Sequence, residues 1–442
     1  MTRAESVAAR LGHELADYLY PVRDWMIDSK GCDADVAIIG SGRRAHLLSY
    51  ALRRERITRQ LLLADPVVDL VEMYGALGEP RTGLPHLDLA GTEFWIPDAG
   101  FGAWLSGWDE ERKETPAGAA LRASWADYLG WLAGLFEVPT PASPSLAAIE
   151  LEADRVRLVQ SDGTSRTARR LVLAGPAADL DRADPRLAAG LAPKALADAS
   201  LLPAPGSLHG QRVLVMGDGP DSGDWAIAAL AEGKARAVVQ VGDAPEKSSA
   251  GHGSAIAPIV RHSFRGLQPA QRAGLHAAAA VFSCTMPSDW ARRLRAHDDQ
   301  YRLVHVGKEA SLSELLLGQG FNPDLVVVPG RPGSAHAACP VRTADGGLCE
   351  LANLFRYFKV DECYRLTTSN GAVLPVIAFG TGAAPAAGPR AQDRFLARYG
   401  IVDVLETISC DFFVEDEGAL FASFQEFRTS ETFGGKLMET KP

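Results

Sequence analysis

The sequence predicts an α/β fold with two parallel sheets, because a short apolar run is twice followed by a Gly-x-Gly turn and a helix-forming stretch. The first unit reads DVAIIGSGRRA, from Asp35 to Ala45, and the second reads RVLVMGDGPDSGDWA, from Arg212 to Ala226. An apolar run that ends at such a turn is typical of a buried strand in a Rossmann-like dinucleotide-binding domain. The 442 residues exceed what one hydrophobic core usually serves. We therefore expect two dinucleotide-binding domains.

The composition is that of an ordinary globular protein, with 47% hydrophobic and 23% charged residues. The net charge of −10 argues against a nucleic-acid partner, because such a binder needs a basic surface that displaces counterions. The six cysteines include no Cys-x-x-Cys pair, which favours free thiols in a reducing cytoplasm over a zinc site or a disulfide framework. We therefore expect no bound metal.

The N-terminal segment SVAARLGHELADYLYPVRDW carries charges throughout, which predicts an amphipathic helix ending near Pro21 and not a signal peptide. No apolar run approaches the length of a transmembrane helix. These two features predict a cytoplasmic protein without a membrane partner.

The first unit continues with LLLAD, a predicted second strand that ends at Asp65. Residues 70–115 are rich in glycine, proline and aromatic residues and predict a long loop, which in compact domains is often functional. Residues 149–175 alternate around an Asp162–Gly163 turn, which predicts a hairpin followed by a buried strand. Helices are expected over residues 45–54 and 119–136.

The second unit follows a linker marked by two prolines and Gly206, and it includes a polar loop over residues 243–265. The phenylalanine-rich tail from Cys410 predicts a helix or arm that packs on the body or on a second subunit. Further strands are expected over 238–242, 301–307, 324–330 and 373–385, and further helices over 268–278 and 288–297. The predicted domains are a first dinucleotide-binding domain in two parts, 31–204 and 331–405, an inserted second one, 205–330, and a C-terminal tail, 406–442.

The first turn has the residues that a dinucleotide site needs. Gly40 permits the tight bend, Gly42 lets the backbone approach a pyrophosphate, and Ala45 takes the third small position, where helix and strand pack. Free N–H groups and the positive end of the helix dipole would face the phosphates. A glycine-rich turn without a cofactor is the alternative. The remaining candidates are two cations at the helix start and one acceptor for the adenosine ribose: Arg43, Arg44 and Asp65.

The second turn is less regular, because GDGPDSG holds one residue more than Gly-x-Gly-x-x-Gly allows. Asp243 occupies the region where an NADPH site usually has Arg or Lys; it would repel a 2′-phosphate and suit a free ribose. Lys247 would compensate for that charge. The alternative is a domain that has lost nicotinamide binding. The candidate residues of the turn itself are Gly217, Gly219, Ser222 and Gly223.

Four segments resemble class B flavin monooxygenases, which include the flavin-containing, Baeyer–Villiger and N-hydroxylating monooxygenases. GSLHGQRVLVMGDGPDSG is similar to their lead-in to the second turn, and GEPRTGLPHLDL with EFWIPDAGFGAW to their flavin-side loop. SWADYLGWLAGLFEVP is similar to the helix that follows, and YRLTTSNGAVLPVIAFGTGAAP to the closing strand. The resemblance covers residues 33–390.

The chain departs from the family pattern at several motifs. The two A-T-G positions read LAGPA and VVPGRP, and the Baeyer–Villiger fingerprint is absent before Gly217. Asp324 with His336 downstream loosely matches the N-hydroxylase pattern.

The resemblance implies FAD at the first turn and NADPH or NADH at the second. Hydride would pass from nicotinamide to flavin, and oxygen would then add at the flavin C4a position, giving a (hydro)peroxyflavin that oxygenates a small molecule. An amine or amino-acid derivative of specialised metabolism is the expected substrate, with N-hydroxylation as the reaction. The implied flavin-side groups are the charge of Arg81, the rings of Trp95 and Trp104, and the backbone of Gly380, Thr381, Gly382 and Ala383.

Two other functions stay open on the same residues. One is an FAD-dependent oxidase or reductase on the same scaffold, and the other is a non-catalytic cofactor-binding protein. A homodimer is a further possibility, with the aromatic tail as its contact.

Overall fold

The structure is a computed structural model of the whole chain. It describes residues 30–40, 42–63, 101, 104–105, 118–137, 146–174, 196–197, 203–217, 220–243, 264, 267–268, 270–272, 288–306, 318, 320–327, 338–388, 391 and 397–429.

The first sheet has ten strands and a parallel centre. Its central strand β5 (Ser165–Ala174) pairs in parallel with β1 (Ala34–Ile39) on one side and β15 (Val373–Phe379) on the other, and β1 also pairs with β2 (Gln60–Leu63). All six residues of β1 are buried, as expected for a continuous apolar run in a parallel sheet. The other six strands are β3 (Leu146–Leu151), β4 (Val156–Gln160), β11 (Pro340–Thr343), β12 (Leu348–Glu350), β13 (Lys359–Val360) and β14 (Arg365–Thr367).

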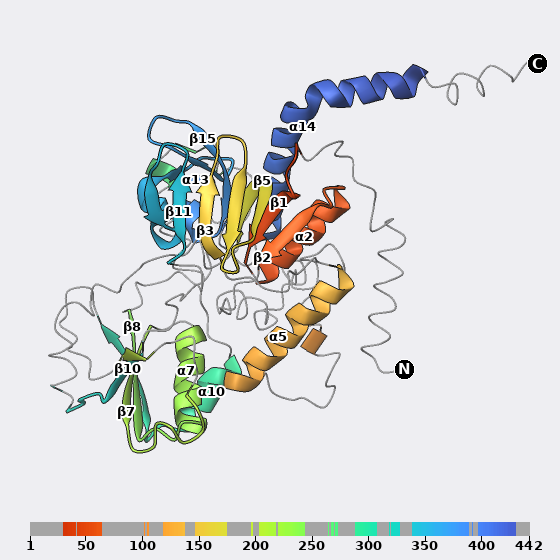
Figure 1. Cartoon of the computed structure of the whole chain (residues 1–442). Coiled ribbons are helices and arrows are strands. Elements are labelled where there is room, and N and C mark those ends of the chain that lie inside the picture. The colour runs from red at the N-terminus through yellow and green to blue at the C-terminus, as the bar shows by residue number, and fades with distance from the viewer. Residues whose placement is uncertain are drawn as a thin grey trace, which may run out of the picture.

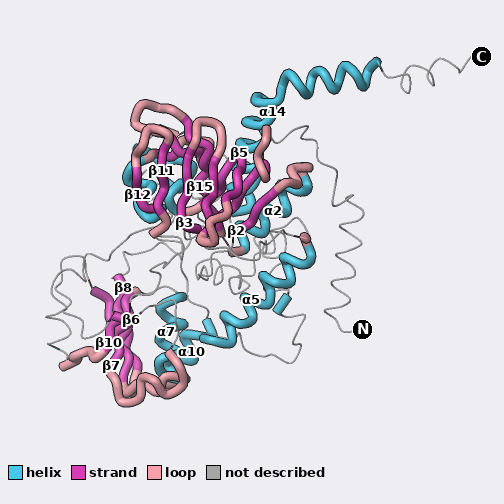
Figure 2. Tube along the Cα trace, in the orientation of Figure 1, coloured by secondary structure: helices cyan, strands magenta, loops and turns pink. Residues whose placement is uncertain are grey.

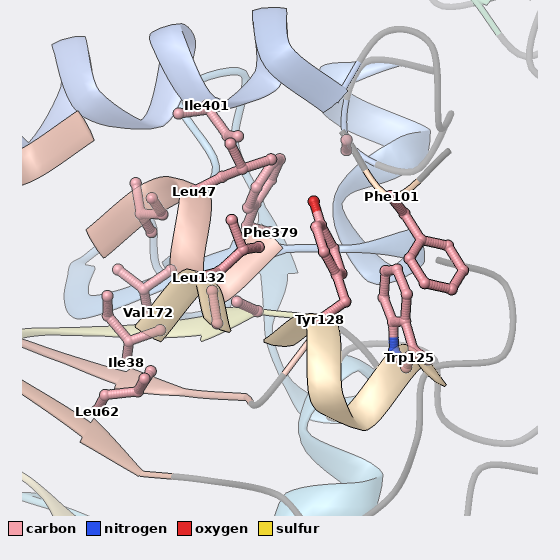
Figure 3. Close-up of a cluster of buried hydrophobic side chains, with 14 of the residues drawn as sticks. Ile38, Leu47, Leu62, Phe101, Trp125, Tyr128, Leu132, Val172, Phe379 and Ile401 are labelled. Atoms are coloured by element: carbon pink, nitrogen blue, oxygen red, sulfur yellow. The ribbon is translucent and has the colours of Figure 1, made fainter. Parts of the chain in front are cut away.

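Helices α2 (Arg43–Arg54) and α14 (Ala397–Thr429) lie on the side of the first sheet that faces the hydrophobic core, and α5 (Gly118–Leu135) packs on α2 and adds side chains to that core (Figure 3). Helix α2 also packs against α14. Helix α14 buries one face at helical spacing: Ile401, Val404, Ile408 and Phe412 are fully buried. Short helices occur at η4 (Leu351–Asn353), α12 (Leu354–Tyr357), η5 (Thr381–Ala383) and α13 (Ala384–Ala387).

Buried charges also fasten α14 to β5. The Arg169 guanidinium donates to the Asp416 carboxylate over 2.9 Å and to the Glu415 carboxylate over 2.7 Å, and its Cζ lies 4.2 Å from the centre of the Phe412 ring. These hydrogen bonds hold the pKa of Glu415 below its usual value, although burial opposes the shift. The helix projects away from the sheet after this point (Figure 1). One helix therefore crosses residue 405, where the sequence predicted the end of the first domain.

The second sheet has five strands, all parallel, in the order β6–β10–β7–β8–β9. Its edge strand β6 precedes residue 204, so the chain enters this sheet earlier than the predicted domain boundary. Because the whole sheet lies in sequence between β5 and β11, it is inserted into the first sheet's unit. Its elements are β6 (Leu196–Ala197), β7 (Arg212–Met216), α7 (Pro220–Ala231), β8 (Ala237–Asp243), α10 (Ser288–Arg295), β9 (Tyr301–Val306) and β10 (Leu325–Val327).

Helix α5 connects the two sheets (Figures 1 and 2). It packs on α2 at one end and on α7 at the other, where Arg122 Nε lies 4.0 Å from the Asp224 carboxylate. In the described part of the chain, no helix has the length and apolarity needed to cross a membrane.

Most predicted elements occur near their expected bounds. The expected strands and helices at 35–39, 45–54, 119–136, 238–242, 288–297 and 301–307 correspond to β1, α2, α5, β8, α10 and β9. The strands over residues 340–367 were not predicted. The N-terminal segment 1–29 and nearly all of the predicted loop 70–115 lie outside the described residues.

Candidate functional site: two glycine turns at two sheet edges

The first candidate site lies where four parallel strands end together. Strand β1 is aligned with β2 and β5, so that Ile39 pairs with both Leu63 and Leu173, and β15 is aligned with β5, so that Phe379 pairs with Ala174. The carboxyl ends of these strands therefore form one edge. In open α/β sheets, ligands bind outside this edge.

Gly40 begins this site directly after β1. It has a φ of 148°, and its N–H donates to the Leu63 carbonyl over 3.0 Å. A Cβ at this position would overlap the carbonyl oxygen of Ala174, on the neighbouring strand. Because that obstacle is backbone, it cannot rotate away, so only glycine fits.

The start of α2 presents its backbone to the same edge. Gly42 is the N-cap and supplies no side-chain hydrogen bond, and no acidic residue lies in the first turn. The first N–H groups of a helix lack partners within the helix, and the dipole there is positive. This end of α2 is therefore suited to a phosphate. Ala45 is fully buried, in keeping with its predicted packing role.

The two arginines that follow Gly42 are buried, with Arg43 2% and Arg44 3% exposed. Arg44 donates to the carbonyl of Ala391 over 3.3 Å, and its guanidinium lies 5.9 Å from the centre of the Phe379 ring. Arg44 thus joins the start of α2 to the segment that follows β15. Two buried cations at the positive end of a helix oppose its dipole, so an anion at this place would stabilise them.

The turn predicted at residues 380–383 lies at the same edge. Gly380 follows the last residue of β15, and Thr381 begins a 3-10 turn that ends at Ala383. The Ala383 N–H donates to the Gly380 carbonyl over 3.1 Å, which closes this turn. The flavin-side role of the backbone of Gly380, Thr381, Gly382 and Ala383 stays a prediction.

The second candidate site repeats this geometry at the edge of the second sheet. Gly217 follows β7, has a φ of 104°, and donates its N–H to the Val241 carbonyl of β8 over 2.6 Å. Helix α7 begins at Pro220, the third residue after Gly217, as α2 begins at Arg43, the third residue after Gly40.

The expected extra residue in the second turn is therefore absent. Ser222 stands where Ala45 stands in the first turn. Its hydroxyl donates to the Met216 carbonyl over 3.0 Å, and a Cβ at Gly217 would lie 2.6 Å from that hydroxyl oxygen. The position requires a small residue, and serine meets this requirement as glycine or alanine would. Gly223, predicted as a residue of the turn, lies inside α7.

Two further side chains hold Gly217, and the sequence interpretation missed both. Gln240 of β8 donates from its amide to the Gly217 carbonyl over 2.9 Å, and the Tyr301 hydroxyl of β9 donates to the Gln240 amide oxygen over 2.8 Å. Burial raises the pKa of Tyr301 to about 12, so this hydroxyl stays protonated at physiological pH. A glutamine inside the apolar run VVQVG was the available signal, because a buried amide needs hydrogen-bond partners.

The charge at the second turn is opposite to that at the first. Asp224 is fully buried in α7, two residues after Ser222. The guanidinium of Arg122 approaches its carboxylate from α5. A buried carboxylate near the start of a helix uses the positive potential that a phosphate would otherwise use.

Several predicted site residues cannot be placed: Asp65, Arg81, Trp95, Gly219, and Lys247 lie outside the described residues. Trp104 is described and packs among aromatic side chains, with its ring centre 5.8 Å from Tyr128 and 6.1 Å from Phe101. Figure 3 shows Phe101, Trp125 and Tyr128 of this cluster inside the hydrophobic core. This environment agrees with a core role for Trp104.

Other reactive groups are scarce in the described part of the chain. It contains no cluster of His, Cys, Asp and Glu side chains that would hold a metal ion, and its five cysteines are free thiols. Burial raises the pKa of Cys339 to about 11 and also raises the pKa of Cys32 and Cys349. Thiols held protonated in this way are poor nucleophiles.

The sequence of the chain resembles one curated protein over about half of its length. No family model matches the chain. An FAD-dependent urate hydroxylase from Xanthomonas campestris is 26% identical over 244 residues, which are 52% of this chain and 50% of that protein. The chain thus matches the curated relative over about half of that protein's length.

Solved structures match over most of the chain. Ornithine hydroxylase from Pseudomonas aeruginosa has a TM-score of 0.51 at 15% identity, covering 85% of this chain and 98% of that one. L-lysine 6-monooxygenase from Pseudomonas syringae has a TM-score of 0.49 at 18% identity, covering 85% and 99%. The likeness to ornithine hydroxylase confirms the predicted fold class, in which one dinucleotide-binding unit is inserted into another.

Proposed function

We propose that the protein is an FAD-dependent monooxygenase that uses NADPH or NADH and oxygenates a small molecule. The observation that carries this proposal is the backbone at Gly40. There, a close approach to Ala174 that only glycine permits meets the uncapped start of α2 and two buried arginines. This combination suits the pyrophosphate of a dinucleotide. The relative that matches about half of the chain is named an FAD-dependent urate hydroxylase, which supports FAD as that dinucleotide.

The chain's own residues would contribute binding and orientation. The N–H groups at the start of α2 would hold the pyrophosphate, Arg44 would supply positive charge, and Asp65 would accept from the ribose. The backbone of residues 380–382 would lie along the flavin. The flavin, when bound, would supply electron transfer and the activation of oxygen.

The second turn would hold the nicotinamide dinucleotide. The turn has the matching helix start and a carbonyl fixed by Gln240 and Tyr301. Gly217, Ser222, Asp243 and the undescribed Gly219 and Lys247 are its proposed residues. Arg81 remains a proposed flavin-side or substrate-side charge.

We further propose an amine or amino-acid derivative as the substrate and N-hydroxylation as the reaction. The structural likeness to a protein named ornithine hydroxylase supports this substrate class. The proposal includes a cytoplasmic enzyme of specialised metabolism, a homodimer, and a first domain in two parts around an inserted domain. The bounds follow the predicted 31–204, 205–330 and 331–405, except that β6 joins the inserted sheet before residue 204 and α14 continues past residue 405.

The visible absorption spectrum of the purified protein tests the cofactor. We expect bound flavin, or its uptake on addition of FAD. Anaerobic mixing with NADH and with NADPH should then bleach the flavin band, and ¹⁸O₂ label should appear in the product of an amine substrate. A protein that takes up no flavin would refute the proposal.

A second candidate function is an FAD-dependent oxidase that its substrate reduces directly. Buried Asp224 at the second turn favours it, because a carboxylate there opposes a second pyrophosphate. In that case neither NADH nor NADPH would bleach the flavin, while an oxidisable amine would, and hydrogen peroxide would form without label in the product.

A further inference from the structure

The inserted unit, which holds the second sheet, contacts the first sheet's unit near Gly40 through one buried side chain. Phe264, in the segment between β8 and α10, is 2% exposed, and its ring lies on Gly388, the residue after α13. A Cβ at Gly388 would lie 2.6 Å from Cε1 and 2.7 Å from Cγ of that ring. Real Cβ atoms do not approach carbon this closely, so ring and backbone are packed with no space between them.

A second contact orients the same segment. Arg272 Nη1 lies 2.6 Å from Glu362 Oε1, in the turn between β13 and β14 of the first sheet. Arg272 also donates through Nε to the Leu267 carbonyl over 3.0 Å, and the Leu267 N–H donates to the Phe264 carbonyl over 3.1 Å. Glu362 is half exposed, so the ion pair contributes little energy, but it shows that Arg272 also lies against the first sheet.

Two hydrogen bonds connect Gly388, through Ala391, with Arg44 at the start of α2. The Gly388 carbonyl accepts from the Ala391 N–H over 3.1 Å, and the Ala391 carbonyl accepts from Arg44 over 3.3 Å. Ala391 is fully buried, and Arg44 lies in the first turn of α2. The Phe264 ring is therefore linked to the Arg44 guanidinium through Gly388 and Ala391.

We infer that Phe264 is a positioning residue for the flavin dinucleotide. It belongs to the inserted unit but acts on the site at the edge of the first sheet. The ring holds the Gly388–Ala391 turn in place, and that turn holds Arg44 at the phosphate-binding start of α2. The inference rests on the proposed function, because it takes the ligand of the Gly40 turn to be FAD. It implies that the flavin site is incomplete without Phe264 of the inserted unit.

Flavin binding by apoprotein variants tests the inference. Phe264→Ala removes the ring and frees the turn, so the Kd for FAD, measured by quenching of flavin fluorescence, should rise on the order of tenfold. Phe264→Leu keeps part of the volume and should show a smaller rise. Phe136→Ala is the matched control, because Phe136 is also fully buried but stacks on Tyr50, with ring centres 4.3 Å apart. It should lower the Tm of the apoprotein without changing the Kd.

A second pair of variants tests the contact from the glycine side. Gly388→Ala places a methyl group in the ring, whereas Gly371→Ala carries the same backbone strain, with φ 84° against 85°, and has nothing within 4 Å. Only Gly388→Ala should weaken FAD binding, and adding Phe264→Ala should reverse part of that loss.

The outcomes separate this inference from the proposed function. A wild-type protein that binds no FAD would refute both. Wild-type binding with an unchanged Kd in Phe264→Ala and Phe264→Leu, or an equal rise in Phe136→Ala, would overturn the positioning role alone.

Discussion

Gly40 and Gly217 stand at the same place in two copies of one strand–turn–helix unit. Each donates its N–H to the neighbouring strand, over 3.0 Å to Leu63 and 2.6 Å to Val241. Each is followed at the third residue by a helix of 12 residues. At each glycine a Cβ would meet an oxygen, but the obstacle is a backbone carbonyl at Gly40 and the Ser222 hydroxyl at Gly217. The two turns thus share a backbone, and only at the first is the obstacle to a Cβ a backbone atom that cannot rotate away.

The charges around the two turns differ more than the backbones do. The first turn of α2 holds two buried arginines and no acid, whereas α7 begins with Pro220 and Asp221 and buries Asp224 one turn later. Helix dipoles favour anions at both starts. The first helix therefore leaves that potential to a ligand, and the second uses part of it for its own carboxylate. Spacing and charge together therefore favour the first turn over the second as a phosphate site.

An aspartate follows both turns at the equivalent sequence position, where a dinucleotide site usually has its ribose acceptor. Because Leu63 and Val241 are equivalent acceptors, Asp65 and Asp243 each stand two residues beyond the equivalent strand position. An acid there suits a ribose with a free 2′-hydroxyl. In the sequence, each turn is thus followed at the same distance by an acid, which we propose as the ribose acceptor for FAD at Asp65 and for NADH at Asp243.

The largest expected effect separates the two glycines. Gly40→Ala forces a methyl group into the Ala174 carbonyl, so the β1–α2 turn must move. Loss of hydrogen bonds to a charged pyrophosphate, about 3 kcal/mol in sum, would cost on the order of 100-fold in FAD affinity. Gly217→Ala meets only a rotatable hydroxyl and should leave FAD affinity unchanged while weakening nicotinamide binding by about tenfold. Isothermal titration of both ligands measures this, with Gly31→Ala as a control for positive φ without a clash. Equal losses of FAD in the two turn variants would contradict the asymmetry.

Arg44→Met should have the next largest effect. It removes the charge and the hydrogen bond to Ala391 while keeping most of the volume, so FAD affinity should fall about tenfold and nicotinamide affinity should not change. Arg53→Met is the control in the same helix, because Arg53 lies in the last turn and pairs with Glu137 over 3.4 Å. The comparison of the turns fails if both variants lose FAD equally.

The sequence was informative where an apolar run ends at a glycine. Buried runs ending at Gly40 and Gly217 located both sheets, because parallel strands read as continuous apolar stretches. The strands over 340–367 have two to four residues each and expose part of their side chains, so they carry no such signal.

The contacts that hold the sites were not predictable in the same way. Ser222 was assigned to the wrong register because glycines were counted instead of small residues. The Tyr301–Gln240 and Phe264–Gly388 contacts join residues far apart in the sequence, and no local pattern encodes such pairings. The fold thus follows from local patterns, whereas the support of each turn follows from tertiary packing.

A third prediction concerns Asp243 and the choice between NADH and NADPH. With Asp243 in place, NADPH should hold no large advantage over NADH in flavin reduction. Asp243→Asn removes the repulsion of a 2′-phosphate and should shift the ratio of KM values toward NADPH by about fivefold. Stopped-flow reduction at two salt concentrations measures the ratio, with Asp65→Asn as a control that should affect FAD retention alone. A strong NADPH preference in the wild-type protein would refute this role of Asp243.

The smallest expected effect concerns the support of Gly217. Tyr301→Phe removes the hydroxyl that orients Gln240, so the KM for the nicotinamide should rise about two- to threefold while FAD affinity stays constant. The pKa of Tyr301 is about 12 in the folded protein, above the ordinary value of 10.0. Between these values the unfolded chain has lost the proton that the native state retains, so stability falls as pH rises. Wild-type protein should therefore lose Tm more steeply than Tyr301→Phe above pH 10, and identical Tm profiles would show that this hydroxyl is not held by the second turn.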